Sequence, residues 1–347
     1  MKKTVKKIVV LIVAMLMLCT TFSCAKYDKN YAIYDLWVAG VKVTTRNKAD
    51  ILGDGTVSYT GNEKEGVLTL NGANVLESSI VGVDEAVIVS RLETLKVNLV
   101  GENKIGMGNK VPKNGICAYG LVIQGQGCLQ VGARSSCVMT QNLTVKSGEI
   151  KTFIKTPYEE IASILGVGLW AQELLLIESG DIQVQYLAEY SPLGYGIYSA
   201  KDLEINGGNI TINSQTATNL AIGLISSGNL KIKGGNINLY AFDDAINARN
   251  FEISGGVVNA TAEDLFAPLS DGVCRLVSKA EFMGGQMNIV LLNKNAVSPI
   301  LYSTNLILQG VKVLGGENKD SLSEKSADYD YIDNFIRIEK EVEWYEK

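Results

Sequence analysis

One short phrase returns along most of this chain: an apolar residue, a variable residue, a small residue, glycine, and then apolar residues at alternate positions. It occupies residues 145–152, 177–184, 205–212, 232–239, 253–260 and 282–289. Its glycine falls at Gly148, Gly180, Gly208, Gly235, Gly256 and Gly285, so successive copies lie 32, 28, 27, 21 and 29 residues apart. Self-similarity at such a period indicates a repeat architecture, in which each unit buries its apolar face against its neighbours.

Within each copy, apolar and polar residues alternate, which is the periodicity of a β-strand. A strand, a glycine bend and a second strand are what one coil of a β-helix requires, because glycine accepts positive φ angles and lets stacked backbones approach closely. We therefore predict an all-β fold, a parallel β-helix (β-solenoid) with roughly ten to twelve coils. The usual chirality of parallel connections predicts a right-handed winding.

The two ends of the repeat region differ from its middle. Residues 34–76 contain alternating segments separated by Gly-Asp-Gly, which predicts a β-rich N-terminal cap to a β-helix domain spanning 34–316. Residues 317–347 are more acidic and are expected to form a short C-terminal cap, with a strand over 331–339, because a solenoid must cover its last edge. A helical signal starting Thr-Pro-Tyr-Glu-Glu, over 156–165, predicts an excursion between coils.

Residues 1–23 are typical of an export signal. Four lysines precede an apolar run over 8–18, which is shorter than the ~20 residues of a membrane-spanning helix. Thr-Phe-Ser-Cys resembles a bacterial lipobox, so Cys24 is the expected lipidation site and 24–33 a tether; the alternative is cleavage after Ala25. Both predict an exported protein, either held at the cell surface by a lipid anchor or secreted.

Charge and composition exclude several classes of function. The formal net charge is −5, and removing residues 1–23, with four lysines and no acids, makes it −9. Nucleic acids and anionic lipid surfaces need clustered Lys and Arg, so neither is an expected partner. The chain contains no histidine, which excludes histidine triads, histidine general bases and the usual zinc sites.

The cysteines that follow the signal region match no metal-binding spacing. They are Cys117, Cys128, Cys137 and Cys274. Free thiols in the core are one interpretation, because cysteine often serves as a small buried apolar residue. A disulfide is the other, because the chain is expected to be exported.

Several segments carry a resemblance to known families. The opening Y-D-L-W-V-A-G-V-K-V-T-T, the phrase L-K-V-N-L-V-G-E-N-K-I and the coil L-E-I-N-G-G-N-I-T-I resemble exported β-solenoid proteins of gut Firmicutes. Residues 229–256 also resemble the carbohydrate-binding β-helix family related to polysaccharide lyases. That resemblance implies a pectate-lyase-like fold that binds acidic polysaccharide and calcium. The family's corner pattern Asp-Asp-Gly-Ile-His stands here as Asp-Asp-Ala-Ile-Asn at 243–247.

Two acidic pairs follow the strands of neighbouring coils. Asp243 and Asp244 come directly after one strand, and Glu263 and Asp264 come 20 residues later, after the next. Because that spacing is close to one coil, the four carboxylates can stack at one corner, where Ca²⁺ would offset their repulsion with hard oxygen ligands. The alternative is that they are solvated turn residues.

Tyrosines gather in the segment that follows the coil at 177–184. They are Tyr186, Tyr190, Tyr195 and Tyr198. Aromatic rings on a flat β-face can hold sugars by stacking, which makes these four the candidate ligand-binding residues. The alternative is that the rings pack the inserted segment onto the rod. Trp170 lies in an apolar run and is expected to pack in the core or on the coil surface.

The function expected from these features is non-catalytic carbohydrate binding or adhesion at the cell surface, with calcium-assisted binding of acidic polysaccharide as its specific form. The partner is then a polysaccharide or a ligand on a host or bacterial surface. The alternatives are a structural adhesin that binds a protein and a polysaccharide lyase. No residue is assigned a catalytic role, because Asp243 and Asp244 would point to opposite faces of a strand and no Lys or Arg is placed as a base.

Overall fold

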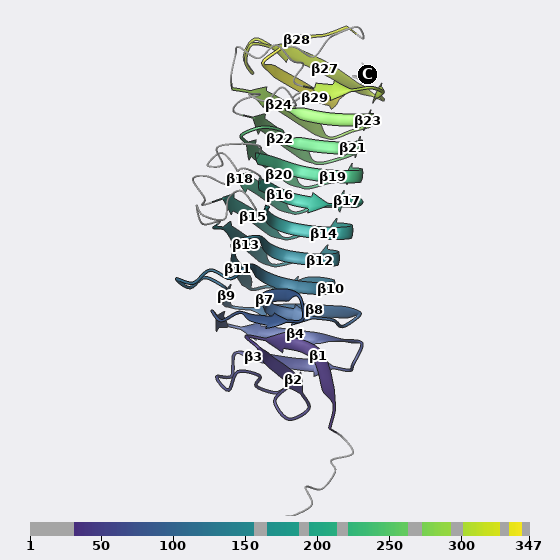
Figure 1. The fold of residues 1–347 in the computed structure, drawn as a ribbon. Helices are drawn as coiled ribbons and strands as arrows, with labels where there is room; N and C mark the ends of the chain where they lie inside the picture. Colours follow the sequence, from purple (N-terminus) through teal and green to yellow (C-terminus); the bar gives the residue numbers. More distant parts are fainter. Residues whose placement is uncertain are drawn as a thin grey trace, which may run out of the picture.

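A computed structural model shows that the chain forms strands stacked along one axis, with the N-terminal strands at one end and the C-terminal strands at the other (Figure 1). The structure describes residues 31–155, 165–186, 194–213, 221–262, 273–292, 301–326 and 333–341. These ranges contain strands and turns and no helix, so they hold no helix that could cross a membrane. The predicted export signal, Cys24 and residues 156–164 of the predicted helix lie outside them.

The described strands belong to two sheets. Sheet A contains β1 (Ile33–Val38), β2 (Val41–Thr44), β3 (Val57–Gly61), β4 (Glu65–Asn71), β6 (Ser79–Val81), β7 (Asp84–Ser90), β8 (Thr94–Val100), β10 (Asn114–Gly125), β12 (Ser136–Val145), β14 (Gly166–Ile177), β16 (Gly194–Ser199), β17 (Asp202–Ile205), β19 (Ala221–Ile232), β21 (Ile246–Ile253), β23 (Cys274–Phe282), β25 (Leu301–Ser303) and β26 (Leu306–Leu308). Sheet B contains β5 (Asn74–Val75), β9 (Glu102–Ile105), β11 (Cys128–Ala133), β13 (Glu149–Ile154), β15 (Asp181–Tyr186), β18 (Asn209–Asn213), β20 (Asn236–Ala241), β22 (Val257–Ala262), β24 (Gln286–Leu291), β27 (Val311–Gly316), β28 (Ser323–Glu324) and β29 (Phe335–Lys340).

The chain alternates between the two sheets and pairs in parallel with the turn before it, which confirms the predicted β-solenoid. About seven regular turns run from β10–β11 to β23–β24. In most of them one bent strand crosses sheet A and a shorter strand crosses sheet B. The estimate of ten to twelve coils was too high. The strands of the two predicted caps pair partly antiparallel, as β1 does with β7 and β29 with β24.

The repeated glycines form the corners between the sheets, as predicted. All six have positive φ, from 75° at Gly285 to 106° at Gly180. They also stack on one another, since a Cβ added at Gly208 would lie 2.5 Å from the carbonyl oxygen of Gly180. A side chain at this position would be strained by its φ and would clash with the turn below.

Inward side chains of successive turns form apolar ladders between the two sheets. One such ladder in sheet A runs through Leu121, Leu143, Leu175, Leu203, Leu230 and Phe251, and all six are buried. The four described cysteines are free and buried, which bears out the first of the two interpretations above. Cys137, for example, is fully enclosed among core residues.

Candidate functional site

The structure places the predicted tyrosines in different environments. Tyr186 is 2% exposed, and its hydroxyl donates to the carbonyl oxygens of Gly166, at 2.6 Å, and Tyr195. This corrects the expectation that Tyr186 contacts a ligand, because its ring is part of the core. Tyr195 and Tyr198 are partly exposed on sheet A, and Tyr190 lies outside the described residues.

The predicted cation site is described in part. Asp243 and Asp244 lie between β20 and β21 and are 5% and 2% exposed. Their backbone is bonded to the preceding turn: the Asp243 N–H donates to the Ala221 carbonyl (3.2 Å), and the Asp244 carbonyl accepts from the Gly223 N–H (3.0 Å). Oδ2 of Asp244 accepts from the Asn247 side-chain amide at 2.9 Å. The expectation of solvated turn residues is therefore wrong for this pair, and Glu263 and Asp264 lie outside the described residues.

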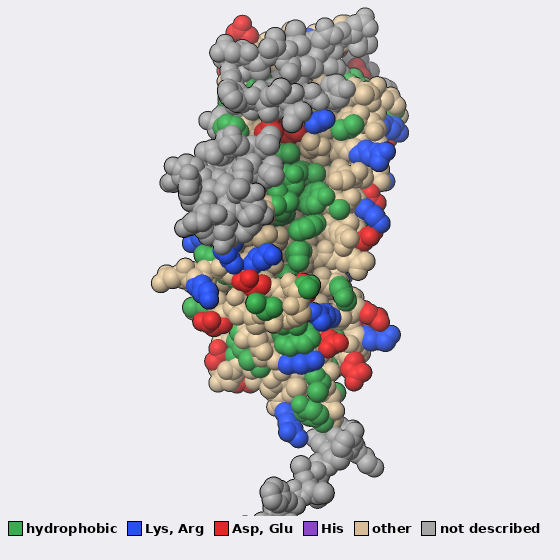
Figure 2. Space-filling view, viewed as in Figure 1, with side chains coloured by type: hydrophobic (Ala, Val, Ile, Leu, Met, Phe, Trp, Pro, Cys, Tyr) green, Lys and Arg blue, Asp and Glu red, His purple; other side chains and the backbone are tan. Residues whose placement is uncertain are grey.

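A column of outward side chains on the first half of sheet A is the most distinctive surface of the solenoid. Strand register stacks Cys117, Met139, Trp170, Tyr198, Ile225, Asn247 and Arg275 in consecutive turns. We call this the aromatic column. The Trp170 and Tyr198 rings have centroids 6.0 Å apart, and the Tyr195 ring lies 5.5 Å from that of Tyr198. Figure 2 shows hydrophobic side chains gathered along the middle of one face of the molecule.

A second column runs beside the first, two residues further along each strand, where sheet A bends. It contains Tyr119, Gln141, Gln172, Ala200, Ser227, Arg249 and Val277, and we call it the bend column. A groove of about 510 Å³ lies between the columns over the turns from Cys117 to Ala200. A further section of about 400 Å³, lined by Ile225, Asn247 and Arg249 among others, follows the same columns over the later turns.

The groove follows from irregularities in the strands. Register shifts interrupt the ladders between Thr140 and Asn142 and between Ser226 and Asn229, and such bulges bend the strand. Hydroxyl groups at the bend satisfy backbone groups: the Thr140 hydroxyl donates to the Trp170 carbonyl at 3.2 Å, and the Ser226 hydroxyl to the Lys201 carbonyl at 2.7 Å. The bend therefore has a fixed shape along the rod.

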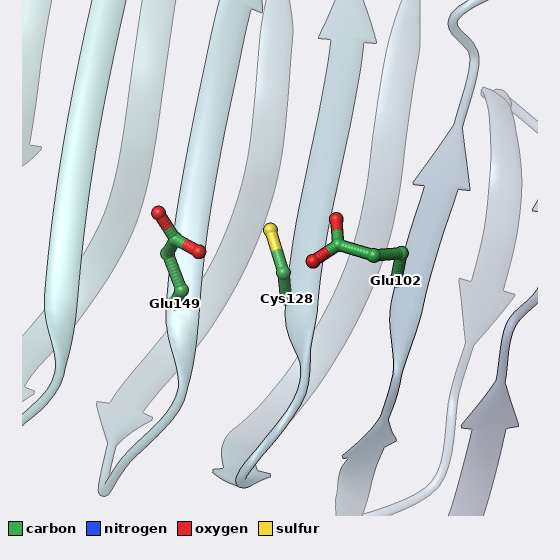
Figure 3. Close-up of side chains that lie close together, drawn as sticks. All are labelled: Glu102, Cys128 and Glu149. Atoms are coloured by element: carbon green, nitrogen blue, oxygen red, sulfur yellow. The ribbon is translucent and has the colours of Figure 1, made fainter.

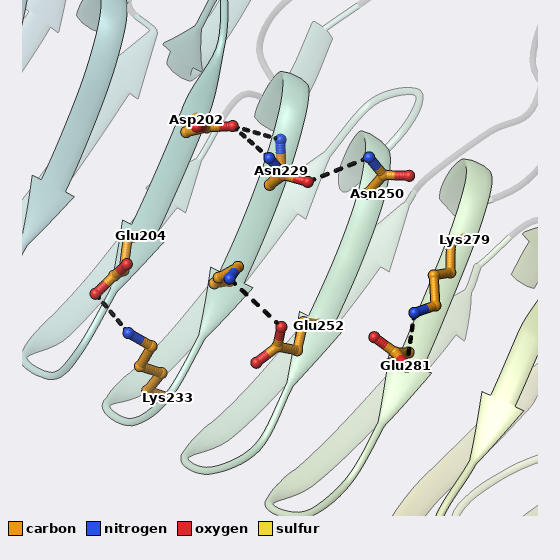
Figure 4. A network of polar contacts seen from close by, with 9 residues as sticks. Asp202, Glu204, Asn229, Lys233, Asn250, Glu252, Lys279 and Glu281 are labelled. Atoms are coloured by element: carbon orange, nitrogen blue, oxygen red, sulfur yellow. Dashed lines mark hydrogen bonds and ion pairs between the residues drawn. The ribbon is translucent and has the colours of Figure 1, made fainter.

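The outward side chains that follow the bend in each turn of sheet A are mostly charged or amide groups. They form charged and amide pairs between turns, among them Lys233 with Glu204 (2.7 Å) and Asn229 with Asp202 (2.7 Å), and Lys279 pairs with Glu281 within β23 (2.8 Å) (Figure 4). The hydrogen bond from Lys233 lowers the pKa of Glu204. These groups pair with one another, and those that pair between turns connect the stacked strands.

One cluster of metal-ligand types lies on sheet B, where Cys128 stands between Glu102 and Glu149 with ligand atoms within 4.8 Å of one another (Figure 3). Burial, and then the charges of Glu149 and Glu102, raise the pKa of Cys128 to about 12, so its thiol stays protonated at neutral pH. Lys151 Nζ lies 2.7 Å from the Glu149 carboxylate and holds its pKa low. The cluster is thus accounted for by its own hydrogen bonds and ion pair.

The aromatic column was not predicted, although the sequence contains a signal for it. A second phrase, glycine followed by an apolar residue, the column residue and a small residue, appears as Gly-Ile-Cys-Ala, Gly-Leu-Trp-Ala, Gly-Ile-Tyr-Ser and Gly-Leu-Ile-Ser at 115–118, 168–171, 196–199 and 223–226. Its third residue faces outward in every copy. Aligning these copies would have placed Trp170 beside Tyr198.

Comparison with known proteins gives one family. Residues 171–265 match the family described as carbohydrate-binding domain-containing protein. The matched segment covers the turns that carry Tyr198, Ile225, Asn247 and Arg249, and it begins directly after Trp170. Searches of curated proteins and of solved structures gave no match.

Proposed function

We propose that this protein binds carbohydrate without altering it, in the groove between the aromatic and bend columns. The observation that carries the proposal is the pair of adjacent, partly exposed rings of Trp170 and Tyr198, together with the amide side chains of Gln141 and Gln172, which line the groove with Trp170. Sugar rings present apolar C–H faces that stack on aromatic rings and hydroxyls that pair with amides. The family match over residues 171–265 supports the same function.

The column geometry suits a linear glycan lying along the rod. Stacked strands repeat every ~4.8 Å, a spacing similar to the length of one pyranose unit in an extended chain. Each turn would then offer one outward side chain and one bend side chain to each sugar. Weak contacts repeated over several turns would give the affinity.

A glycan panel with matched variants tests the proposal. Purified protein is titrated with xylo-, manno-, gluco- and galacturonate oligosaccharides and followed by calorimetry. Trp170→Ala is expected to weaken binding about tenfold or more, as for a buried aromatic anchor. Tyr240→Ala is the control, because Tyr240 is 41% exposed on β20 in sheet B and away from the groove.

The panel also separates the other functions. No binding to any glycan would leave a protein-binding adhesin as the better account. Release of unsaturated products from polyuronate would show a lyase, and equal binding by Trp170→Ala and the parent protein would place the sugar site elsewhere.

Calcium assistance is a separate part of the proposal. The Asp243 and Asp244 carboxylates are adjacent and buried, and buried carboxylates beside one another suit a hard cation. One carboxylate oxygen of Asp244 is already bonded to Asn247, so a bound ion would share this group. Oligogalacturonate titrations with calcium and with chelator test the proposal, since Asp243→Asn with Asp244→Asn should abolish any calcium-dependent heat.

We also propose that the protein is exported and held at the cell surface through a lipid on Cys24. The basic and apolar N-terminal segment followed by Thr-Phe-Ser-Cys supports this. Metabolic labelling with a fatty-acid analogue tests it, because Cys24→Ala should remove the label. An unchanged label would exclude lipidation at this residue.

A further inference from the structure

The groove closes at its N-terminal end. Met139 of the aromatic column is partly exposed, whereas Cys117 in the turn below is 4% exposed and Val89, its neighbour in β7, is 1% exposed. Val89 and Cys117 pack in one cluster with Trp37 and Val81, from β1 and β6. A ligand that follows the column in this direction therefore meets a covered end.

A charged pair stands at the closed end. Asp84 and Arg91 line the groove there together with Ser90. Arg91 Nη2 lies 3.7 Å from the Asp84 carboxylate and donates to the backbone carbonyl oxygen of Val81 at 2.9 Å. The guanidinium also lies over the Trp37 ring, 5.8 Å from its centroid. These contacts hold the guanidinium in place. Its five N–H donors outnumber the two acceptors named here, the Asp84 carboxylate and the Val81 carbonyl.

In the opposite direction the two columns extend over further turns. Beyond Tyr198, Ile225 and Asn247 stack in the next turns and, with Arg249, line a second section. Ser227 and Ser278 line the same section and offer hydroxyl groups there. Within the described residues, the columns therefore have one covered end, which carries an acid and a base, and one direction in which they continue.

We propose that the groove recognises the end of a glycan chain, with Asp84 and Arg91 binding the terminal sugar; this rests on the proposed function. A terminal sugar keeps a hydroxyl that an internal sugar has lost to its glycosidic bond. A carboxylate beside a guanidinium offers an acceptor and donors to neighbouring hydroxyls, as charge-assisted hydrogen bonds. The remainder of the chain passes over Met139, Trp170 and Tyr198.

Binding stoichiometry on long chains tests this directly. Xylohexaose, mannohexaose and hexagalacturonate are compared by calorimetry with linear xylan, mannan and polygalacturonate of defined length. End recognition predicts one protein bound per polymer chain, with equal affinity per chain for hexamer and polymer. Many proteins along each chain, with affinity conserved per sugar, would overturn the proposal.

Two variants separate this proposal from the proposed function. Asp84→Asn keeps the size of the side chain and removes its charge, so hexamer binding should weaken about tenfold. Arg91→Lys keeps the charge but loses the planar group and should weaken it similarly. Circular dichroism establishes that both variants are folded, and Tyr240→Ala is the unchanged control.

The outcomes differ for the two claims. If Trp170→Ala weakens hexamer binding while folded Asp84→Asn and Arg91→Lys leave it unchanged, the groove binds glycan but does not read its end, and this proposal fails alone. If no hexamer or polymer binds, or Trp170→Ala has no effect, the proposed function fails and the end-recognition proposal fails with it.

Discussion

The stacked corner glycines allow a quantitative test of how the solenoid is held together. Gly208 has a φ of 91°, and a Cβ added there would lie 2.5 Å from the carbonyl oxygen and 3.1 Å from the nitrogen of Gly180. Gly208→Ala therefore introduces two costs, an unfavourable φ for an L-residue and a clash with the backbone of the turn below. Neither can be relieved by rotating a side chain.

Two other glycines separate these costs. Gly72 has a φ of 65° and open space where its Cβ would be, so Gly72→Ala should cost only the backbone term, about 1–2 kcal/mol. Gly255 needs no positive φ, but its Cβ would lie 2.4 Å from the Lys233 carbonyl oxygen, so Gly255→Ala should cost about 1–3 kcal/mol of overpacking. Gly208→Ala carries both terms, and we expect roughly 2–5 kcal/mol.

Urea unfolding followed by circular dichroism in the strand band measures all three variants. The order of midpoints should be the parent protein, then the two single-cost variants, then Gly208→Ala, at similar slopes. A Gly208→Ala midpoint equal to that of Gly72→Ala would refute the reasoning. It would mean that the corners can separate without cost and that the turns are not closely stacked there.

Three further predictions follow from individual contacts. Tyr186→Phe should lower the free energy of unfolding by about 1–3 kcal/mol, because two buried carbonyls lose their donor; an unchanged urea midpoint would contradict this. Arg337→Ala should speed hydrogen exchange in β24 and β29. Arg337 donates to Asn288 Oδ1 at 2.8 Å, and the Asn288 amide donates in turn to Asn259, so Arg337 ends a ladder of asparagine side chains. Unchanged exchange would show that the ladder does not depend on Arg337. Burial raises the pKa of Cys137 from 9.0 to about 12. Folding therefore favours the neutral thiol over the thiolate. The free energy of unfolding keeps this contribution below pH 9 and loses it as the pH rises toward 12. Cys137→Ala should lose less stability than the parent protein over that interval, and parallel pH profiles would exclude the effect.

The corners of the fold could be predicted because glycine is required there for two physical reasons at once. Gly148 to Gly285 have φ values and close backbone contacts that other residues do not tolerate, so their spacing marks each turn. The ends were harder, because antiparallel strands such as β3 and β4 alternate in the same way as coil strands. Alternation identifies a strand but does not reveal the direction of its partner.

The candidate site was predicted only in part. In β15, Ile182, Val184 and Tyr186 alternate on the inward face, so the period of two already places the Tyr186 ring in the core. The aromatic column depends on register between turns, because Trp170 and Tyr198 are 28 residues apart in sequence and directly paired in space. The bend column depends on bulges, and no residue type marks those unambiguously.

The central claim is that sugar binds over Trp170, and the fluorescence of that residue tests it most directly. The chain has three tryptophans, so Trp37→Phe with Trp344→Phe leaves Trp170 alone to report. Titration with a glycan that binds by calorimetry should shift its emission to shorter wavelength, because the sugar excludes water from the partly exposed indole. The midpoint should match the calorimetric affinity. Calorimetric binding with no change in Trp170 emission would place the sugar elsewhere and contradict the account.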